Sequence, residues 1–471
     1  MSENTIEKPR LPLGARIKKM HPTQIIIAGF AALILLGALL LSLPVATVSG
    51  EGISFLDACF TSTSAVCVTG LVVVDTGTAF TLFGQIVILV LIQMGGLGFM
   101  TITSFVFILV GKRITLSDRM IIKESLNEFN LSGLVSMIRK ILIVTFTAEL
   151  IGAALFAVRM VPMFGAKGIY YSIFHSISAF CNAGFDVLGS VSGPFSSMTM
   201  FQSDVLVNLT LIALITIGGL GFVVVANISD CTRIRKRKCL SRYSKLVLIT
   251  SGILVLLGLV VVFPLELGNP ETLGGESVTT GGKILGGVFQ AVTPRTAGFS
   301  TIDQGAMMPA TKFITMLLMF IGASPAGTGG GIKTTTIAIL LMYAVSGITN
   351  KRDVKLMERR IAKDTIRRAV SITALGIVFV FATFFALLAI EGQRGGLFTF
   401  ENIFFEAFSA FGTVGLSAGI TPSLSAGSRI VIMIAMFAGR VGLMTLTFAL
   451  ANRAGGGRAK LRYPEERFMV G

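Results

Sequence analysis

Long uncharged apolar runs alternate along the chain with shorter apolar segments. Ile25–Leu43 is long enough to cross a bilayer, whereas Ile53–Thr63 after it is too short. A glycine-containing loop follows, and Thr81–Val110 is again long and uncharged. A segment too short to span can enter a membrane only where protein or a water-filled cavity satisfies its backbone. The pattern therefore predicts a unit of long helix, short re-entrant helix, loop and long helix.

The same unit recurs three more times. One segment, Phe313–Gly347, is too long for a single straight span. We expect an all-α polytopic membrane protein: four pseudo-symmetric helix–re-entrant pore helix–loop–helix repeats around one central pore, with eight spanning helices. The other long segments are Ile141–Pro162, Val205–Ile228, Leu246–Leu265, Ala369–Ile390 and Ile430–Ala451, and the short ones are Ile169–Phe180, Gly282–Val292 and Phe400–Phe411.

Each short segment leads into a similar glycine loop. The loop glycines are Gly70, Gly184, Gly298 and Gly415, spaced 114, 114 and 117 residues apart. The residue after each glycine is Leu or Phe, and three of the four loops have Ser six residues before it. A period this long is not that of a solenoid and indicates four copies of a whole subdomain.

Four such loops entering from one side can meet on a common axis. Glycine permits positive φ, which lets successive carbonyl groups turn the same way. Rings of carbonyl oxygens can replace the hydration shell of a monovalent cation. No ionised acceptor stands beside the glycines, which favours an alkali cation over Ca²⁺ or Mg²⁺. The alternative is that the small residues only allow helices to pack closely.

Composition and charge support a membrane protein. Of 471 residues, 53% are hydrophobic and 14% charged, with a mean hydropathy of +0.83. The net charge of +16 could suggest nucleic-acid binding, but its placement follows the positive-inside rule and predicts both termini in the cytoplasm. The five cysteines form no metal or disulfide pattern. The basic residues gather in Arg10–Lys19, Lys112–Lys140, Arg233–Lys245, Lys351–Arg368 and Arg453–Arg467.

The four loops resemble the filter sequences of the Trk/Ktr/HKT superfamily of potassium transporters. The resemblance covers about residues 22–452, and with no extra hairpin before the first unit it is to a Ktr-type membrane subunit. It implies a potassium pathway in a prokaryotic plasma (inner) membrane. K⁺ would be bound by backbone carbonyls, and four glycines fit potassium better than sodium. The implied filter residues are Cys67, Val68, Thr69, Gly70, Cys181, Asn182, Ala183, Gly184, Arg295, Thr296, Ala297, Gly298, Gly412, Thr413, Val414 and Gly415.

The resemblance also implies partners. These are a second copy of the chain in a homodimer and a cytoplasmic RCK-type ring that binds ATP/ADP or NAD. Sodium stimulation or symport is a further expectation from relatives, and no organic cofactor is expected in this chain. The cytoplasmic basic clusters are expected to set topology, and some of them to contact the ring or anionic lipids. No nucleic-acid partner is expected.

A glycine-rich stretch interrupts the last long segment of the third unit. Residues 323–334 contain Pro325 and four glycines, which break a helix. A phosphate-binding P-loop would need Gly-Lys-[Ser/Thr], but Ile332 precedes the lysine. The resemblance favours a movable loop that obstructs the pore, and a passive kink is the alternative. With the buried charge of Arg440, the expected gate residues are Gly327, Thr328, Gly329, Gly330, Gly331, Lys333 and Arg440.

Arg295 lies three residues before Gly298, so its side chain must point away from bound cations. We expect it to brace the third loop, through a nearby acid. The candidate acids, which could also make the pore mouth negative, are Asp57, Asp186, Glu401 and Glu406.

The predicted organisation has no catalytic domain. No HExxH, GxSxG or acidic-pair motif is present, so an enzyme is not expected, and four copies in one orientation argue against an inverted-repeat transporter. The predicted divisions are an N-terminal tail 1–20, repeat 1 at 21–113, linker 114–140, repeat 2 at 141–230, basic linker 231–244, repeat 3 at 245–347, basic linker 348–368, repeat 4 at 369–452 and a C-terminal tail 453–471.

Overall fold

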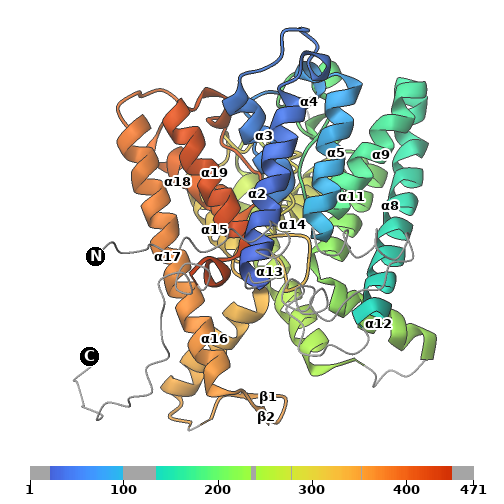
Figure 1. The fold of residues 1–471 in the computed structure, drawn as a ribbon. Coiled ribbons are helices and arrows are strands. Elements are labelled where there is room, and N and C mark those ends of the chain that lie inside the picture. The colour runs from blue at the N-terminus through green and yellow to red at the C-terminus, as the bar shows by residue number, and fades with distance from the viewer. Residues whose placement is uncertain (1–21, 99–133, 235–239, 277, 352, 448–471) are drawn as a thin grey trace, which may run out of the picture.

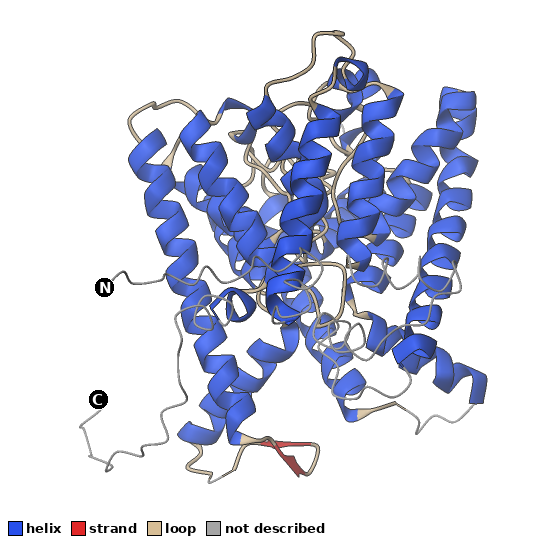
Figure 2. Ribbon diagram, viewed as in Figure 1, coloured by secondary structure: helices blue, strands red, loops and turns tan. Residues whose placement is uncertain are grey.

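The computed structural model describes residues 22–98, 134–234, 240–276, 278–351 and 353–447. The predicted tails, most of the first linker, the ends of repeats 1 and 4 and part of the second linker lie outside these ranges. Figures 1 and 2 show a helical bundle with one small hairpin, which confirms the all-α polytopic membrane class. The boundaries of the four repeats stay a prediction.

Helices account for nearly all the regular structure in the described ranges. The first half contains α2 (Pro22–Leu41), η1 (Pro44–Ala46), α3 (Phe55–Cys67), α4 (Thr76–Ala79), α5 (Leu82–Leu97), α8 (Leu134–Phe164), α9 (Ala166–Phe180), α10 (Gly189–Ser192), η2 (Thr199–Phe201), α11 (Val205–Gly219) and α12 (Phe222–Ile234). The second half contains α13 (Arg242–Leu267), α14 (Thr280–Val292), α15 (Pro309–Phe320), α16 (Thr334–Ile348), β1 (Lys355–Leu356), β2 (Arg359–Arg360), α17 (Lys363–Glu391), α18 (Phe400–Gly412), η3 (Thr421–Ser423) and α19 (Ala426–Val441).

Four helices are long and apolar enough to span a membrane by themselves. They are α2, α8, α13 and α17, and the bent pair α11 and α12 makes a fifth if it counts as one span, all within the described residues. Each carries exposed apolar side chains, such as Leu150 on α8 at 72% and Val260 on α13 at 62%. Such a surface suits lipid rather than water.

Each of these four long helices packs against the short helix that follows it in the chain. The pairs are α2 with α3, α8 with α9, α13 with α14, and α17 with α18. Three of the short helices begin at a hydroxyl N-cap, in which Ser54, Thr279 or Thr399 accepts a backbone N–H three residues on. These caps explain why the short helices begin where they do.

In the first, second and fourth units, the helix after the glycine loop is not the continuous span that the sequence predicted. The segment Val205–Ile228 divides into α11 and α12, which meet at 102°. Helix α19 ends at Val441, short of the predicted Ala451, and Gly442 has φ +88°. Helix α5 ends at Leu97, and residues 321–333 separate α15 from α16. Continuous helices were therefore wrong for three units, because glycine-rich turns end or bend them, whereas the break in the third unit lies where the sequence had placed an interruption.

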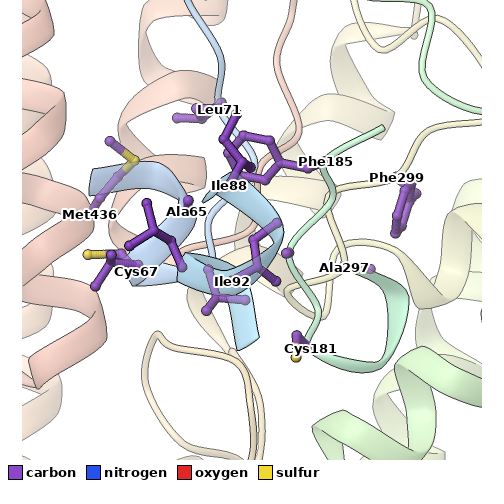
Figure 3. Close-up of a cluster of buried hydrophobic side chains, with 14 of the residues drawn as sticks. Ala65, Cys67, Leu71, Ile88, Ile92, Cys181, Phe185, Ala297, Phe299 and Met436 are labelled. Carbon is purple, nitrogen blue, oxygen red and sulfur yellow. The ribbon is translucent and has the colours of Figure 1, made fainter. Parts of the chain in front are cut away.

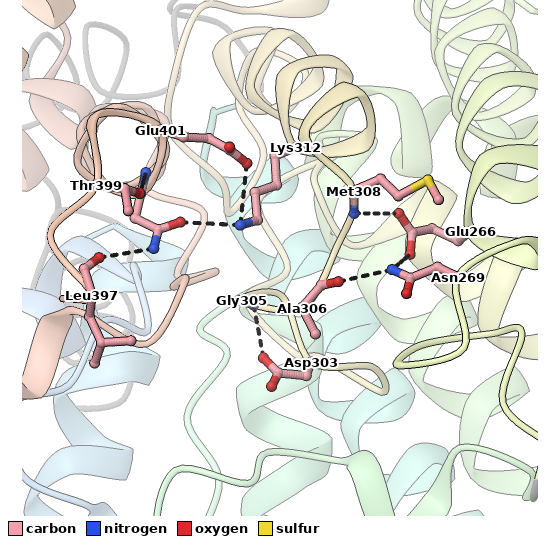
Figure 4. Close-up of polar contacts among 11 residues, drawn as sticks. Glu266, Asn269, Asp303, Gly305, Ala306, Met308, Lys312, Leu397, Thr399 and Glu401 are labelled. Atoms are coloured by element: carbon pink, nitrogen blue, oxygen red, sulfur yellow. Dashed lines mark hydrogen bonds and ion pairs between the residues drawn. The ribbon is translucent and has the colours of Figure 1, made fainter.

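Buried carboxylates tie the ends of two long helices to the helices that follow the glycine loops. Glu266, at the end of α13, accepts the backbone N–H of Met308, which is the N-cap of α15, at 3.0 Å (Figure 4). Glu391, at the end of α17, accepts the N–H of Ser425, the N-cap of α19, at 2.8 Å. The same device thus fixes the third and fourth units.

Candidate functional site

The four loop glycines come together in a closed ring. An added Cβ at Gly184 would lie 2.6 Å from the Cα of Gly298, and one at Gly298 would lie 2.7 Å from the carbonyl oxygen of Val414. Added Cβ atoms would likewise overlap Ala183 O at Gly70 and Thr69 O at Gly415. The first loop therefore contacts the second, the second the third, the third the fourth, and the fourth the first.

The loop backbones share an unusual conformation. Two residues before each glycine the chain is left-handed: φ is +57° at Val68, +59° at Asn182, +64° at Thr296 and +50° at Thr413. The glycines also have positive φ, between +70° and +96°. Left-handed β-branched residues are outliers that cost about 1–3 kcal/mol each and cluster at functional sites. The same conformation in four loops therefore indicates a built site.

Hydrogen bonds from the short helices hold this conformation. Ser64 accepts the N–H of Gly70 at 3.0 Å through Oγ, and Ser409 accepts that of Gly415 at 3.1 Å. Ser178 occupies the related place in the second loop and donates to the carbonyl oxygen of Phe185. In the third loop Val292 stands at that place, and the next residue, Thr293, donates to the carbonyl oxygen of Phe299. A hydroxyl at the repeated serine position, or one residue after it in the third unit, thus anchors each loop to its own helix.

Apolar packing also fixes the loops. The residues after the four glycines, which are Leu71, Phe185, Phe299 and Leu416, are all 1% exposed or less. Figure 3 shows Leu71, Phe185 and Phe299 around the loops, with Ile88 and Ile92 of α5 beside them. Burying a Leu or Phe side chain contributes about 1.5–3 kcal/mol, enough to offset the backbone strain.

A cavity of about 350 Å³ opens directly on the glycine ring. All four loop glycines line it, together with Asp186, Asp303 and hydroxyls that include Ser197, Ser300 and Ser417. We call it the mouth cavity. Of the predicted acids, Asp186 alone lines it; its Oδ1 accepts the N–H of Leu188 at 3.1 Å.

The interrupting stretch 323–334, which we call the gate loop, is bound to the broken helix of the second unit. The N–H of Ser324 donates to Gly219 O at 3.0 Å and that of Thr328 to Gly218 O at 3.2 Å. In return Phe222 N–H donates to Ala326 O at 2.8 Å. The break between α11 and α12 leaves the carbonyls of Gly218 and Gly219 free to accept, since the last carbonyls of a helix have no partner within it.

The gate loop also touches the ring from below. The N–H of Gly330 donates to Oγ1 of Thr413 at 2.9 Å, and a Cβ at Gly329 would overlap the side chain of Thr296. The Lys333 ammonium donates to Gly329 O at 2.7 Å, within the loop itself. The loop therefore sits against the left-handed residues of the third and fourth loops.

Arg440 joins three segments at this point. Its guanidinium donates to Thr328 O in the gate loop and to Gly95 O and Gly96 O at the end of α5. A second cavity of about 350 Å³, the gate-side cavity, is lined by Gly327, Gly329, Lys333, Arg368 and Arg440. The predicted gate residues thus lie close together, although within the described ranges Thr328 is the only one of them that hydrogen-bonds to the Arg440 side chain.

Arg295 is buried behind the third loop, but its predicted acidic partner was wrong. Its guanidinium donates to Ser251 Oγ on α13 at 3.1 Å. The proposed acids have other partners: Asp57 pairs with Arg429, and Glu401 with Lys312 at 3.2 Å. Glu406 accepts from the hydroxyls of Ser417 and Thr421. The hydroxyl of Ser251 accepts from one nitrogen of the Arg295 guanidinium, and the buried Nε of Arg295 has no hydrogen-bond partner among the described residues.

Several site residues were missed because only the fold brings them together. Gly218 and Gly219 appear in the sequence as part of a Gly-Gly-Leu-Gly-Phe run, yet nothing there shows that their carbonyls hold another unit's loop. Gln93 on α5 donates to Glu149 at 2.9 Å and accepts from the Cys181 thiol at 3.5 Å. The Gly-Gly-Leu-Gly-Phe run also occurs at 95–99, and this repetition was the one signal in the sequence that these glycines belong to the site.

Comparisons with known proteins identify the family of the chain. The family model described as "TrkH: Cation transport protein" matches residues 13–454. The Ktr system potassium uptake protein B of Bacillus subtilis is 39% identical, with 96% of this chain and 97% of that protein covered. The potassium/sodium uptake protein NtpJ of Enterococcus hirae is 40% identical, over 96% of this chain and 98% of that protein.

A solved structure shares the fold. The crystal structure of the potassium transporter TrkH from Vibrio parahaemolyticus matches with a TM-score of 0.71 at 18% identity, covering 92% of this chain and 86% of that one. Since that identity is low, this likeness concerns the fold alone.

Proposed function

The chain belongs to the TrkH family of cation transport proteins, and from that premise we propose that it is the membrane subunit of a potassium uptake system. Relatives in this family are transporters rather than enzymes, and the resemblance to Ktr-type membrane subunits is confirmed by the Ktr relatives. Potassium would move down its electrochemical gradient through a channel-like path along the ring axis. The closed ring of four left-handed glycine loops carries this proposal.

The filter would be made of backbone oxygens. The left-handed residue and the glycine two positions later would direct the carbonyl groups of each loop toward a common axis. Carbonyl rings of this kind substitute for the water around a dehydrated alkali ion. The assignment of the residues from Cys67 to Gly70, Cys181 to Gly184, Arg295 to Gly298 and Gly412 to Gly415 rests on this arrangement.

The gate loop would close the path below the filter. It contacts the base of the ring through Gly330 and Thr413 and is held by Arg440. A guanidinium and the Lys333 ammonium beside the axis would also repel a cation. Opening would require the loop to leave the carbonyls of Gly218 and Gly219.

The remaining proposals concern the surroundings of the chain. By analogy with the Ktr systems we propose a homodimer in the bacterial plasma membrane with both termini cytoplasmic, docked to an RCK-type nucleotide-binding ring. The sodium in the name of the E. hirae relative supports testing sodium stimulation. Some of the cytoplasmic basic residues are proposed to contact anionic lipids.

The test is potassium uptake into liposomes by the purified protein with Gly298→Ala. The new Cβ would meet Val414 O at 2.7 Å and Gly184 Cα at 2.9 Å at a backbone φ of +78°. We expect uptake to fall roughly tenfold or more, because strain of 1–3 kcal/mol distorts the ring. Gly281→Ala is the matched control, since nothing lies within 4 Å of that position. Equal uptake by both variants would refute the filter assignment.

A further inference from the structure

A third cavity lies at the far end of α16, away from the ring. It measures about 580 Å³ and is lined by Leu341, Met342, Val345, Ser346 and Thr349 of the helix and its end, with Lys351, Asp353 and Lys355 beyond. We call it the α16 groove. Its lining residue Lys355 belongs to β1, and the β1–β2 hairpin lies at the foot of the bundle in Figure 1.

The groove changes from apolar to cationic along its length. Leu341 and Val345 share one face of α16 and are 60% and 57% exposed. The next position on this face is Thr349, and the exposed lysines Lys351 and Lys355 follow. One surface thus offers contacts for a hydrocarbon chain at one end and for an anion at the other.

The cationic end is not neutralised by the chain itself. Asp353, which also lines the groove, forms an ion pair with Arg360 at 2.9 Å. Neither Lys351 nor Lys355 forms an ion pair within the ranges that the structure describes. Two ammonium groups therefore remain available beside the apolar part.

The neighbouring helix shows where the membrane boundary falls. Helix α17 packs against α16 and carries Lys363, Asp364, Arg367 and Arg368 in its first two turns. From Ala369 to Ile390 it has no charged residue, which is long enough to span. The connection from Thr349 to Lys363 thus lies on the polar side of this boundary. Ile332, just before α16, lies against Gly376 of α17, so α16, which runs the opposite way, reaches the boundary near Leu341, at the apolar end of the groove.

We propose that the α16 groove binds an anionic glycerophospholipid. Its phosphate would lie between Lys351 and Lys355, and an acyl chain would follow Leu341 and Val345. A soluble acidic protein would use the lysines but leave the apolar wall uncovered, and a neutral lipid would use the wall but leave the lysines. Only a lipid with both parts matches the whole groove.

Such a lipid would bear on transport, and this part rests on the proposed function. Helix α16 begins directly after the gate loop, with Lys333 as its N-cap residue. The groove is formed while the gate loop is bound to Arg440 and Thr413. A ligand that prefers one conformation raises its population, so a lipid that binds the groove more tightly in this state than in the open one would keep the gate loop seated.

Binding is tested on the full-length protein in nanodiscs with fluorescent phosphatidylglycerol. The double variant Lys351→Gln/Lys355→Gln removes both proposed headgroup contacts. It should weaken binding roughly thirtyfold, because each lysine near an anionic headgroup contributes a factor of about five to six. Arg242→Gln/Lys245→Gln, two exposed cations on the first turn of α13, is the matched control and should bind as the wild type does. The double Lys→Arg variant should retain binding.

Three results would overturn the site. They are equal weakening by the control pair, equal competition by phosphatidylcholine, or displacement of the lipid by millimolar inorganic phosphate, which would indicate a free anion. Leu341→Asn/Val345→Asn must also weaken binding if an acyl chain uses the wall.

Transport is measured in the same preparations. Phosphatidylglycerol liposomes should show faster potassium uptake for Lys351→Gln/Lys355→Gln than for the wild type, and phosphatidylcholine liposomes should show no difference. Equal rates in both lipids would overturn the link to the gate loop. Uptake with no lipid binding would sink this inference alone, whereas lipid binding by a protein that transports no potassium would sink the proposed function.

Discussion

Val68, Thr296 and Thr413 are β-branched, yet each takes a left-handed conformation that such residues rarely adopt. Local preference alone would have predicted extended backbone there. The strain is tolerated because the following residues are buried and the short-helix hydroxyls bind each loop. In this conformation the side chains of Thr296 and Thr413 point toward the gate loop.

The Thr413 hydroxyl offers a specific test of that contact. Thr413→Val keeps the shape but leaves the buried N–H of Gly330 without its acceptor, at a cost of about 1–3 kcal/mol. We expect potassium leak without a cytoplasmic partner to rise at least roughly fivefold. Thr383→Val removes only a hydroxyl bound within its own helix and serves as the control. If the potassium leak does not rise in Thr413→Val, the hydrogen bond from Gly330 to Thr413 has no part in gating.

Asp186 gives a prediction for pH. Burial raises the pKa of this mouth carboxyl to about 7, and the neighbouring Asp75 carboxylate adds to the rise. Asp186 is therefore neutral below pH 7 and negative above it, where it attracts cations to the mouth. Uptake at low potassium should increase as pH passes upward through 7, and Asp186→Asn should abolish that step. A step that persists in the variant would assign it elsewhere.

The informative elements are the interrupted helices. A continuous α11 would bond its own carbonyls, but the turn at Leu220 and Gly221 leaves Gly218 O and Gly219 O for the gate loop. Gly221 needs its φ of +91° to make that turn, and a Cβ there would overlap Pro325 O. The gate loop is thus bound by one helix break and by Arg440 near the end of another helix.

Arg440 can act through its charge or through its fork of donors. Arg440→Ala removes both, whereas Arg440→Lys keeps the charge but cannot bridge Thr328 O and Gly95 O together. If bridging holds the loop, both variants should raise uptake without the cytoplasmic partner several-fold. If repulsion dominates, only Arg440→Ala should do so. Unchanged uptake by Arg440→Ala, with and without the partner, would remove Arg440 from the gate.

At the scale of the whole molecule, contacts between the first and last units close the bundle. Helix α19 packs against α3, although 359 or more residues of chain separate them. The Arg429 guanidinium on α19 pairs with Asp57 on α3, and both side chains are about one-fifth exposed, at 21% and 19%. This ion pair therefore joins the unit that contains the fourth glycine loop to the unit that contains the first.

Breaking that pair should therefore lower the stability of the whole bundle. Asp57→Asn and Arg429→Gln should each lower the thermal midpoint in detergent, and a double-mutant cycle should give a coupling of about 1 kcal/mol or more, above the exposed range. Lys140 and Asp230, each 47% exposed, form the control pair, for which we expect less coupling. Equal coupling in both pairs would argue against a ring-closing role.

The sequence by itself determined the membrane class, the short helices and the four glycine loops, because hydropathy, segment length and recurring Ser, Gly and Leu/Phe positions are local properties. It also marked residues 323–334 and Arg440 as unusual, since proline, glycines and a charge stand out in apolar runs. Only the tertiary structure decided where the other post-loop helices break, that Arg295 meets Ser251 rather than an acid, and which carbonyls hold the gate loop. Those outcomes depend on groups brought together from distant parts of the chain, whose donors and acceptors no local pattern can pair.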